Sequence, residues 1–156
     1  MKTHSIPYLC LLFISCIAIG CAAKPPKPPE PIPPALPDIR KGILQTALSL
    51  KGKPYQKSGK GPKSFDCSGF VSFVYKKSNI TLPPSTDEMS GVGQKISLRN
   101  VMPGDLVFFK TMKFFHVGIM LNKREFIHAS TRKGITVDRI DSYYWRRMSH
   151  HFRKVL

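Results

Sequence analysis

The hydrophobic pattern of this chain changes period once, and that change restricts the folds that the chain can adopt. Apolar residues recur at helical spacing in residues 39–50 and 67–77, and a capping box at 85–88 predicts a short third helix. Beyond residue 100 the pattern becomes that of short strands separated by polar turns. These strand segments are 106–109, 117–121, 125–129, 135–139 and 152–156. Helices followed by consecutive strands predict an α+β domain, in which the helices pack on one side of an antiparallel sheet of about five to six strands.

The first 37 residues are expected to lie outside this domain. Residues 1–20 carry one basic residue, Lys2, and continue as an uncharged apolar run. Such a run is typical of a secretory signal and is too short for an ordinary membrane-spanning helix. Residues 21–37 contain eight of the fourteen prolines, which predicts an extended linker. Residues 38–156 then have the length of one ordinary domain.

The sequence Ala18-Ile19-Gly20-Cys21 resembles the lipobox of bacterial lipoproteins, in which a small residue precedes an acylated cysteine. We therefore predict lipid attachment at Cys21, with Cys16 as a weaker alternative and plain secretion as another. Several acyl chains on one cysteine would anchor the protein stably in a membrane. By the same resemblance, Ala22 in place of aspartate predicts sorting to the outer membrane of the cell envelope, facing the periplasm.

Cys67 is the only cysteine in the predicted domain, since the other three lie within the first 21 residues. Asp66 before it is a good N-cap, so Cys67 would begin a helix whose dipole favours the thiolate. An unpaired thiol in an exported protein is unusual, because structural cysteines in oxidising spaces are normally paired. With His116 and His128 downstream, the pattern indicates a cysteine nucleophile with a histidine base. An ordinary buried helix residue is the alternative.

His116 and His128 lie twelve residues apart on neighbouring strands of a predicted hairpin that turns near residues 122–124. A loop with an odd number of residues, centred on Asn122, would place the two side chains directly opposite each other on one face of the sheet. A two-residue loop would send them to opposite faces. Rings on opposite faces would exclude a joint role in catalysis.

The formal charge of +16 narrows the classes of binding partner. Such a charge suits nucleic acid, an anionic membrane surface or another anionic polymer. No zinc-finger spacing, aromatic RNA-binding signature or dense basic run points to nucleic acid. For an exported and anchored domain the nearest anionic polymer is the cell wall, although a generic basic surface remains an alternative.

Four motifs, in the right order, resemble the NlpC-type cysteine peptidases of bacterial cell walls. They are Asp66-Cys67-Ser68-Gly69-Phe70-Val71, Pro103-Gly104-Asp105-Leu106-Val107-Phe108-Phe109, His116-Val117-Gly118-Ile119 and Phe126-Ile127-His128-Ala129-Ser130. The resemblance runs from about residue 39 to the C-terminus. It implies a papain-like α+β fold and hydrolysis of peptidoglycan stem peptides, usually between D-glutamate and meso-diaminopimelate. It implies no metal or other cofactor, and we expect a monomer.

Carried over by position, the resemblance makes Cys67 the nucleophile, His116 the base and His128 the third polar member of the triad. Tyr55 matches a tyrosine that helps to hold the oxyanion, together with the backbone N–H of Cys67. The reaction would pass through a thioester acyl-enzyme. Because a protonated His128 could no longer accept a hydrogen bond from His116, activity should fall below about pH 6.5.

The substrate contacts are less defined than the triad. Asp66, Ser68 and Ser85 are candidates, although helix capping explains Asp66 and Ser68 as well. Residues 56–59 and 82–84 depart from the sequences that relatives have beside the substrate groove. An amidase that cuts at the first stem residue, a catalytically silent wall-binding lipoprotein and a zinc site at the cysteine and histidines remain alternatives. Trp145 could stack on sugar, but a core position fits it better.

Overall fold

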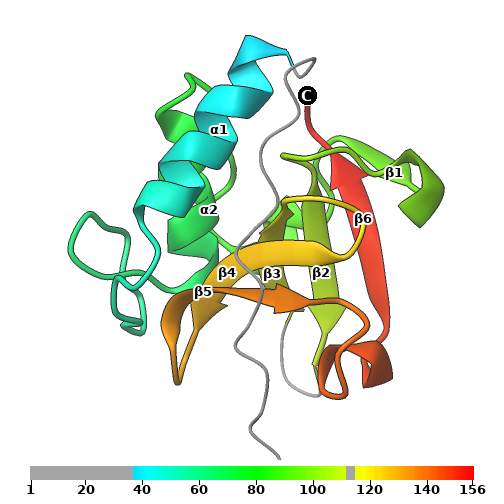
Figure 1. The fold of residues 1–156 in the computed structure, drawn as a ribbon. Coiled ribbons are helices and arrows are strands. Elements are labelled where there is room, and N and C mark those ends of the chain that lie inside the picture. The colour runs from blue at the N-terminus through cyan, green and yellow to red at the C-terminus, as the bar shows by residue number, and fades with distance from the viewer. Residues whose placement is uncertain (1–36, 112–114) are drawn as a thin grey trace, which may run out of the picture.

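The structure is a computed structural model that describes residues 37–111 and 115–156 (Figure 1). The predicted signal sequence, the lipid attachment at Cys21 or Cys16 and all but the last residue of the predicted linker lie outside the described residues. Among the described helices, none is long and apolar enough to cross a membrane.

The described residues form three α-helices followed by a six-stranded antiparallel sheet, so the α+β prediction is confirmed. The helices are α1 (Asp38–Ser49), α2 (Cys67–Lys76) and α3 (Thr86–Met89). The strands are β1 (Gln94–Ile96), β2 (Leu106–Lys110), β3 (Phe115–Met120), β4 (Glu125–Ser130), β5 (Gly134–Arg139) and β6 (His150–Lys154). Two 3₁₀ turns, η1 (Leu98–Asn100) and η2 (Trp145–Arg147), complete the described elements. The strand order is β1-β6-β2-β3-β4-β5.

Strand β1 pairs with β6 at the edge of the sheet and is not predicted by the sequence pattern. Only Ile96 of its three residues is apolar, so the segment has no alternating pattern to mark it. Its strand conformation comes from pairing with a segment about 60 residues away in sequence.

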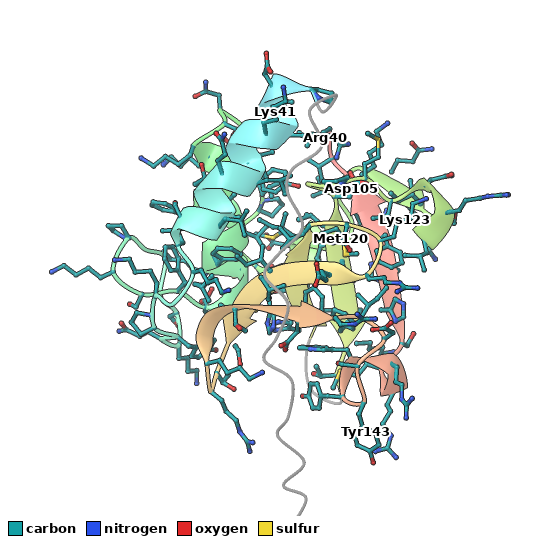
Figure 2. The ribbon with its side chains drawn as sticks, viewed as in Figure 1. Arg40, Lys41, Asp105, Met120, Lys123 and Tyr143 are labelled. Carbon is teal, nitrogen blue, oxygen red and sulfur yellow. The ribbon has the colours of Figure 1, made fainter. Side chains whose placement is uncertain are left out.

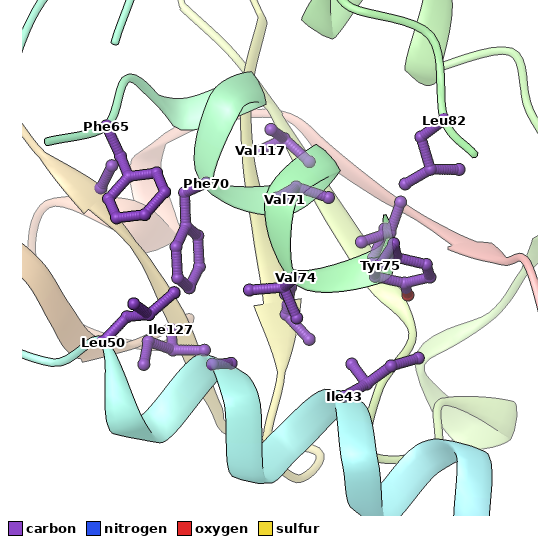
Figure 3. Close-up of a cluster of buried hydrophobic side chains, with 14 of the residues drawn as sticks. Ile43, Leu50, Phe65, Phe70, Val71, Val74, Tyr75, Leu82, Val117 and Ile127 are labelled. Carbon is purple, nitrogen blue, oxygen red and sulfur yellow. The ribbon is translucent and has the colours of Figure 1, made fainter. Parts of the chain in front are cut away.

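Helix α2 lies between α1 and the sheet, where it contacts β3 and β4 (Figure 1). Its apolar positions Phe70, Val71 and Val74 are fully buried, as the helical spacing predicted. Figure 3 shows them packed among Ile43, Leu50, Phe65, Tyr75, Leu82, Val117 and Ile127. This core holds the N-terminus of α2 beside the sheet.

The other face of the sheet is also covered. A second cluster contains Val101, Val107, Phe109, Met120, Phe126, Ile140, Trp145 and Phe152. Strand β2 therefore contributes Leu106 and Phe108 to one core and Val107 and Phe109 to the other. Burial on both faces explains why β2 is a continuous apolar run rather than an alternating one.

A buried ion pair joins the helical part to the sheet. The guanidinium of Arg40 on α1 donates to Oδ1 of Asp105 at 3.0 Å and to the carbonyl of Pro103 at 2.7 Å. The other oxygen of Asp105 accepts the backbone N–H of Met102 at 2.8 Å. Figure 2 shows Arg40 and Asp105 together near the C-terminal end of the chain. The Pro-Gly-Asp motif thus has a structural role at the start of β2.

The hairpin that carries the two histidines has a different register from the predicted one. Strand β3 pairs with β4 through Ile119 with Ile127 and through Met120 with Phe126, which centres the turn on Lys123. The prediction of a turn centred on Asn122, with the histidines directly opposed, is therefore wrong. The side-chain oxygen of Asn122 accepts the backbone N–H groups of residues 124 and 125, and these bonds close the turn one residue later. The observed pairing differs from the predicted one by two residues. Because successive side chains of a strand point to opposite faces, a shift of two residues leaves both histidines on the same face.

Candidate active site

Cys67 is the first residue of α2, as predicted. The carboxylate of Asp66 caps the helix by accepting the N–H of Gly69 at 2.5 Å. Cys67 is a free, half-buried cysteine whose Sγ lies 3.4 Å from the hydroxyl oxygen of Thr86 on α3. Because the thiol is partly accessible and stands at a helix N-terminus, it meets two conditions for a reactive cysteine.

Asp66 and Ser68, two candidate substrate contacts, are bonded within the chain. The ammonium of Lys60 lies 3.2 Å from both oxygens of Asp66 and donates to Ser68 Oγ at 3.0 Å. It also donates to the carbonyl of Pro84 at 3.3 Å. The capping interpretation of Asp66 is confirmed, and Lys60 ties residues 56–64 to the start of α2.

Ser85, the third candidate substrate contact, caps α3 by accepting the N–H of Glu88 at 3.2 Å. Of the two hydrogen bonds that define the predicted capping box, this one is confirmed. A substrate role for Asp66, Ser68 and Ser85 stays a prediction.

The two histidines form a hydrogen-bonded pair. Nε2 of His116 lies 2.9 Å from Nδ1 of His128, with the ring planes 86° apart. His128 is buried and His116 is half-buried. Burial first, and the neighbouring His128 second, lower the pKa of His116 well below its ordinary value. His116 is therefore neutral at neutral pH and can accept a proton.

Trp145 packs against both histidines and is 6% exposed, so its core interpretation is confirmed. Its ring stacks on His116 at a centroid distance of 5.3 Å. Phe126 stacks on His128 at a centroid distance of 4.9 Å and meets the Trp145 ring edge-to-face at 5.2 Å. These aromatic rings restrict the orientation of both imidazoles.

Asp138 on β5 also belongs to the site, although no motif in the sequence predicts it. Its Oδ2 lies 3.2 Å from Nε2 of His128 and accepts the indole N–H of Trp145 at 3.0 Å. Its Oδ1 lies 3.4 Å from the ammonium of Lys133. The bond to His128 is the first cause that holds the pKa of Asp138 well below its usual range. In the sequence, the one sign of this role is an acidic residue inside a predicted strand. The pairing of β5 with β4, which brings Asp138 close to His128, could not be predicted.

These side chains converge on one cavity of about 540 Å³. It is lined by Tyr55, Cys67, Thr111, His116, His128, Ser130, Thr131, Arg132, Lys133, Asp138, Tyr144 and Trp145. The cavity thus joins the thiol, the histidine pair and the tyrosine expected at the oxyanion. Burial, followed by Cys67 and Asp66, raises the pKa of Tyr55, so its hydroxyl keeps its proton and can donate. In the described part of the chain, no group of three His, Cys, Asp or Glu residues is placed to hold a metal ion.

Comparison with known proteins agrees with this arrangement. The model of the NlpC/P60 family matches residues 52–154, which include the four motifs on which the resemblance rests. This chain belongs to the NlpC/P60 family. The expected relationship to the NlpC-type cysteine peptidases is therefore confirmed.

Two proteins of Escherichia coli K12 are similar along most of this NlpC/P60 chain. The "Probable endopeptidase NlpC" is 32% identical over 151 residues, which cover 94% of this chain and 98% of that protein. The "Murein DD-endopeptidase MepS/Murein LD-carboxypeptidase" is 34% identical over 121 residues, which cover 76% of this chain and 64% of that protein. The chain thus spans nearly all of the first relative and just under two thirds of the second.

Among solved structures, an NLP/P60-family protein of Staphylococcus aureus, described as similar to lipoprotein, has a TM-score of 0.68 and 32% identity. The match covers 74% of this chain and 41% of that one. The papain-like α+β fold expected from the motifs is confirmed.

Proposed function

We propose that this protein is a murein endopeptidase that hydrolyses peptidoglycan stem peptides through the thiol of Cys67. The observation that carries the proposal is the cavity in which Cys67, the hydrogen-bonded pair of His116 and His128, and Tyr55 meet. Both E. coli relatives are named as endopeptidases, and the name of the second specifies murein, which supports the proposal.

The proposed reaction is acyl transfer. Nε2 of His116 is bonded to His128, which leaves Nδ1 to take the thiol proton. The thiolate then attacks the scissile carbonyl carbon, and the backbone N–H of Cys67 and the hydroxyl of Tyr55 meet the developing oxyanion. Collapse of the tetrahedral intermediate breaks the C–N bond, and the leaving amine takes its proton from His116. Water, deprotonated by His116, then splits the thioester and releases the carboxylate and the thiol.

The proposal also concerns which bond of the stem peptide is cleaved. Resemblance to the family favours the bond between D-glutamate and meso-diaminopimelate, whereas the name of MepS gives DD-endopeptidase and LD-carboxypeptidase activities for that relative. Each specificity releases fragments of different mass from the same muropeptide. A single digestion therefore separates them.

The test is digestion of purified muropeptides of known linkage by the full chain in detergent, followed by mass spectrometry. We expect cleavage by the native protein and none by Cys67→Ala. An unchanged substrate with the native protein would contradict the enzymatic proposal, and binding without cleavage would identify a silent wall-binding protein instead. Equal cleavage by both proteins would contradict the role of Cys67. Release of the whole stem peptide would identify an amidase.

We further propose a lipid anchor at Cys21, preceded by a cleaved signal and followed by an extended linker to residue 37. The support is the lipobox-like sequence and the high proline content. The test is incorporation of labelled palmitate into the native protein, Cys21→Ser and Cys16→Ser, with separation of inner and outer membranes. Only Cys21→Ser should lose the label, and the native protein should fractionate with the outer membrane.

A further inference from the structure

We propose that Asp138 is a positioning residue that sets the direction of the hydrogen bonds through the histidine pair, so that His116 presents an unprotonated Nδ1 to Cys67. The inference rests on the proposed function for its catalytic meaning. Its structural content, the position of each ring proton, can be measured without any activity.

The direction of the two hydrogen bonds, from His128 to Asp138 and from His116 to His128, follows from which atoms can donate and which can accept. An ionised carboxylate can only accept, so the 3.2 Å contact between Asp138 Oδ2 and His128 requires a hydrogen on Nε2 of His128. A neutral imidazole carries one ring hydrogen, so Nδ1 of His128 must be an acceptor. The nitrogen 2.9 Å from it is Nε2 of His116, which must therefore be the donor. The lone pair of His116 then lies on Nδ1.

Without the carboxylate, the opposite direction becomes available to the pair. His128 could then carry its hydrogen on Nδ1 and donate to Nε2 of His116. That arrangement would place the hydrogen of His116 on Nδ1, the nitrogen needed for the thiol proton. The hydrogen bond between the two histidines is compatible with both states. The contact with Asp138 favours the state in which Nδ1 of His116 is unprotonated and can act as the base.

The surroundings of Asp138 suit this role. Its Oδ2 also accepts the indole N–H of Trp145, and Lys133 approaches its other oxygen. Trp145 in turn stacks on His116. Because the lowered pKa of Asp138 keeps it ionised throughout the neutral and mildly acidic range, the acceptor at His128 is always present. The same negative charge favours the imidazolium that forms when His116 takes the thiol proton.

A purely structural role for Asp138, as a link between β5 and Trp145, predicts different results. Loss of such a link would lower the melting temperature and would leave the ring protons where they are. Loss of the positioning role moves the ring protons and lowers kcat while KM changes little.

The test compares Asp138→Ala and Asp138→Asn in the full chain. Alanine removes the acceptor, and we expect kcat to fall by about 10²–10⁴, toward the loss known when an orienting aspartate is neutralised in a serine-protease triad. Asparagine can turn its NH₂ group toward Nε2 of His128 and so select the opposite ring form, which is the cause of the loss in that triad, and its effect on kcat should be at least as large. The matched control is Asp141→Asn, because Asp141 is exposed and pairs with Arg139 at 2.7 Å. It should retain native kcat.

The deciding readout is the nitrogen-15 spectrum of the histidine rings. In the native protein we expect hydrogens on Nε2 of both His116 and His128, and in Asp138→Ala a mixture of both ring forms. A native spectrum with the hydrogen of His128 on Nδ1 would overturn the proposal even if neither variant folds. So would a folded Asp138→Ala with kcat within about threefold of native.

If the native protein cleaves no muropeptide, the proposed function fails, but the ring spectra still decide the role of Asp138. The rate at which iodoacetamide alkylates Cys67 at neutral pH then replaces kcat. It should fall in Asp138→Ala and stay native in Asp141→Asn.

Discussion

Gly118 on β3 lies so close to His128 on β4 that a Cβ at position 118 would come within 3.2 Å of the Cβ of His128. It would also come within 2.6 Å of Cδ2 of Phe126, whose ring stacks on His128. The glycine of the His-Val-Gly-Ile motif therefore provides the space in which the histidine pair and its aromatic neighbour fit together.

From this contact we expect Gly118→Ala to push Phe126 against His128 and to displace the imidazole from His116. A displacement of about 1 Å at a catalytic group can cost about 10²-fold in rate, so kcat should fall to that extent. Steady-state kinetics and a melting curve measure both effects. Gly91→Ala is the control, since its Cβ would meet only an ordinary contact at 3.5 Å. Native kcat in Gly118→Ala would contradict the geometry.

Tyr55→Phe tests the oxyanion assignment. The raised pKa of Tyr55 means that its hydroxyl is a donor throughout the working range of pH. If this hydroxyl meets the oxyanion, its removal should lower kcat by about 10²–10³ and leave KM nearly unchanged. Tyr143→Phe is the control, because Tyr143 is 68% exposed and bonds to Arg147 (Figure 2). A drop in kcat of less than about threefold would exclude Tyr55 from the oxyanion site.

The ion pair between Arg40 and Asp105 should matter for stability rather than for chemistry. Both side chains are buried, so Arg40→Met leaves an uncompensated carboxylate and should cost about 3–5 kcal/mol in the free energy of unfolding. Lys41→Met, one residue along α1, removes a pair with a fully exposed Asp38 and should cost about 0–1 kcal/mol. Denaturant unfolding of the two variants compares them directly. Equal midpoints would contradict the prediction.

The lowered pKa of His116 predicts how stability depends on pH. In the unfolded chain the histidine takes up a proton below about pH 6.5, whereas in the fold it stays neutral to lower pH. The unfolded state therefore gains protons first, and the contribution of His116 to stability, present above pH 6.5, is lost as pH falls below it.

Melting temperatures between pH 8 and pH 5 measure this contribution. His116→Gln should flatten the fall in melting temperature below about pH 6.5. His150→Gln, an exposed position on β6, should retain the native slope. A slope that His116→Gln leaves unchanged would show that other groups cause it.

Much of the fold could be predicted because its signals are local. The spacing of Phe70, Val71 and Val74 predicted the buried face of α2, and Asp66 and Ser85 predicted where two helices begin. Each of these features depends on residues within about one or two helical turns. Strand β1 could not be predicted, since its stabilising partner, β6, lies far along the chain.

The sequence by itself determined which groups are present and where the helices and most strands form. It placed Cys67 at a helix start and His116 and His128 on adjacent strands. Only the tertiary structure decided how these strands pair, and with that the 2.9 Å contact between the histidines and the place of Asp138 beside them. The physical reason is that strand register depends on turn closure at Asn122 and on packing from both faces of the sheet. The role of Asp138 on β5 therefore becomes apparent only once the pairing of β5 with β4 is known.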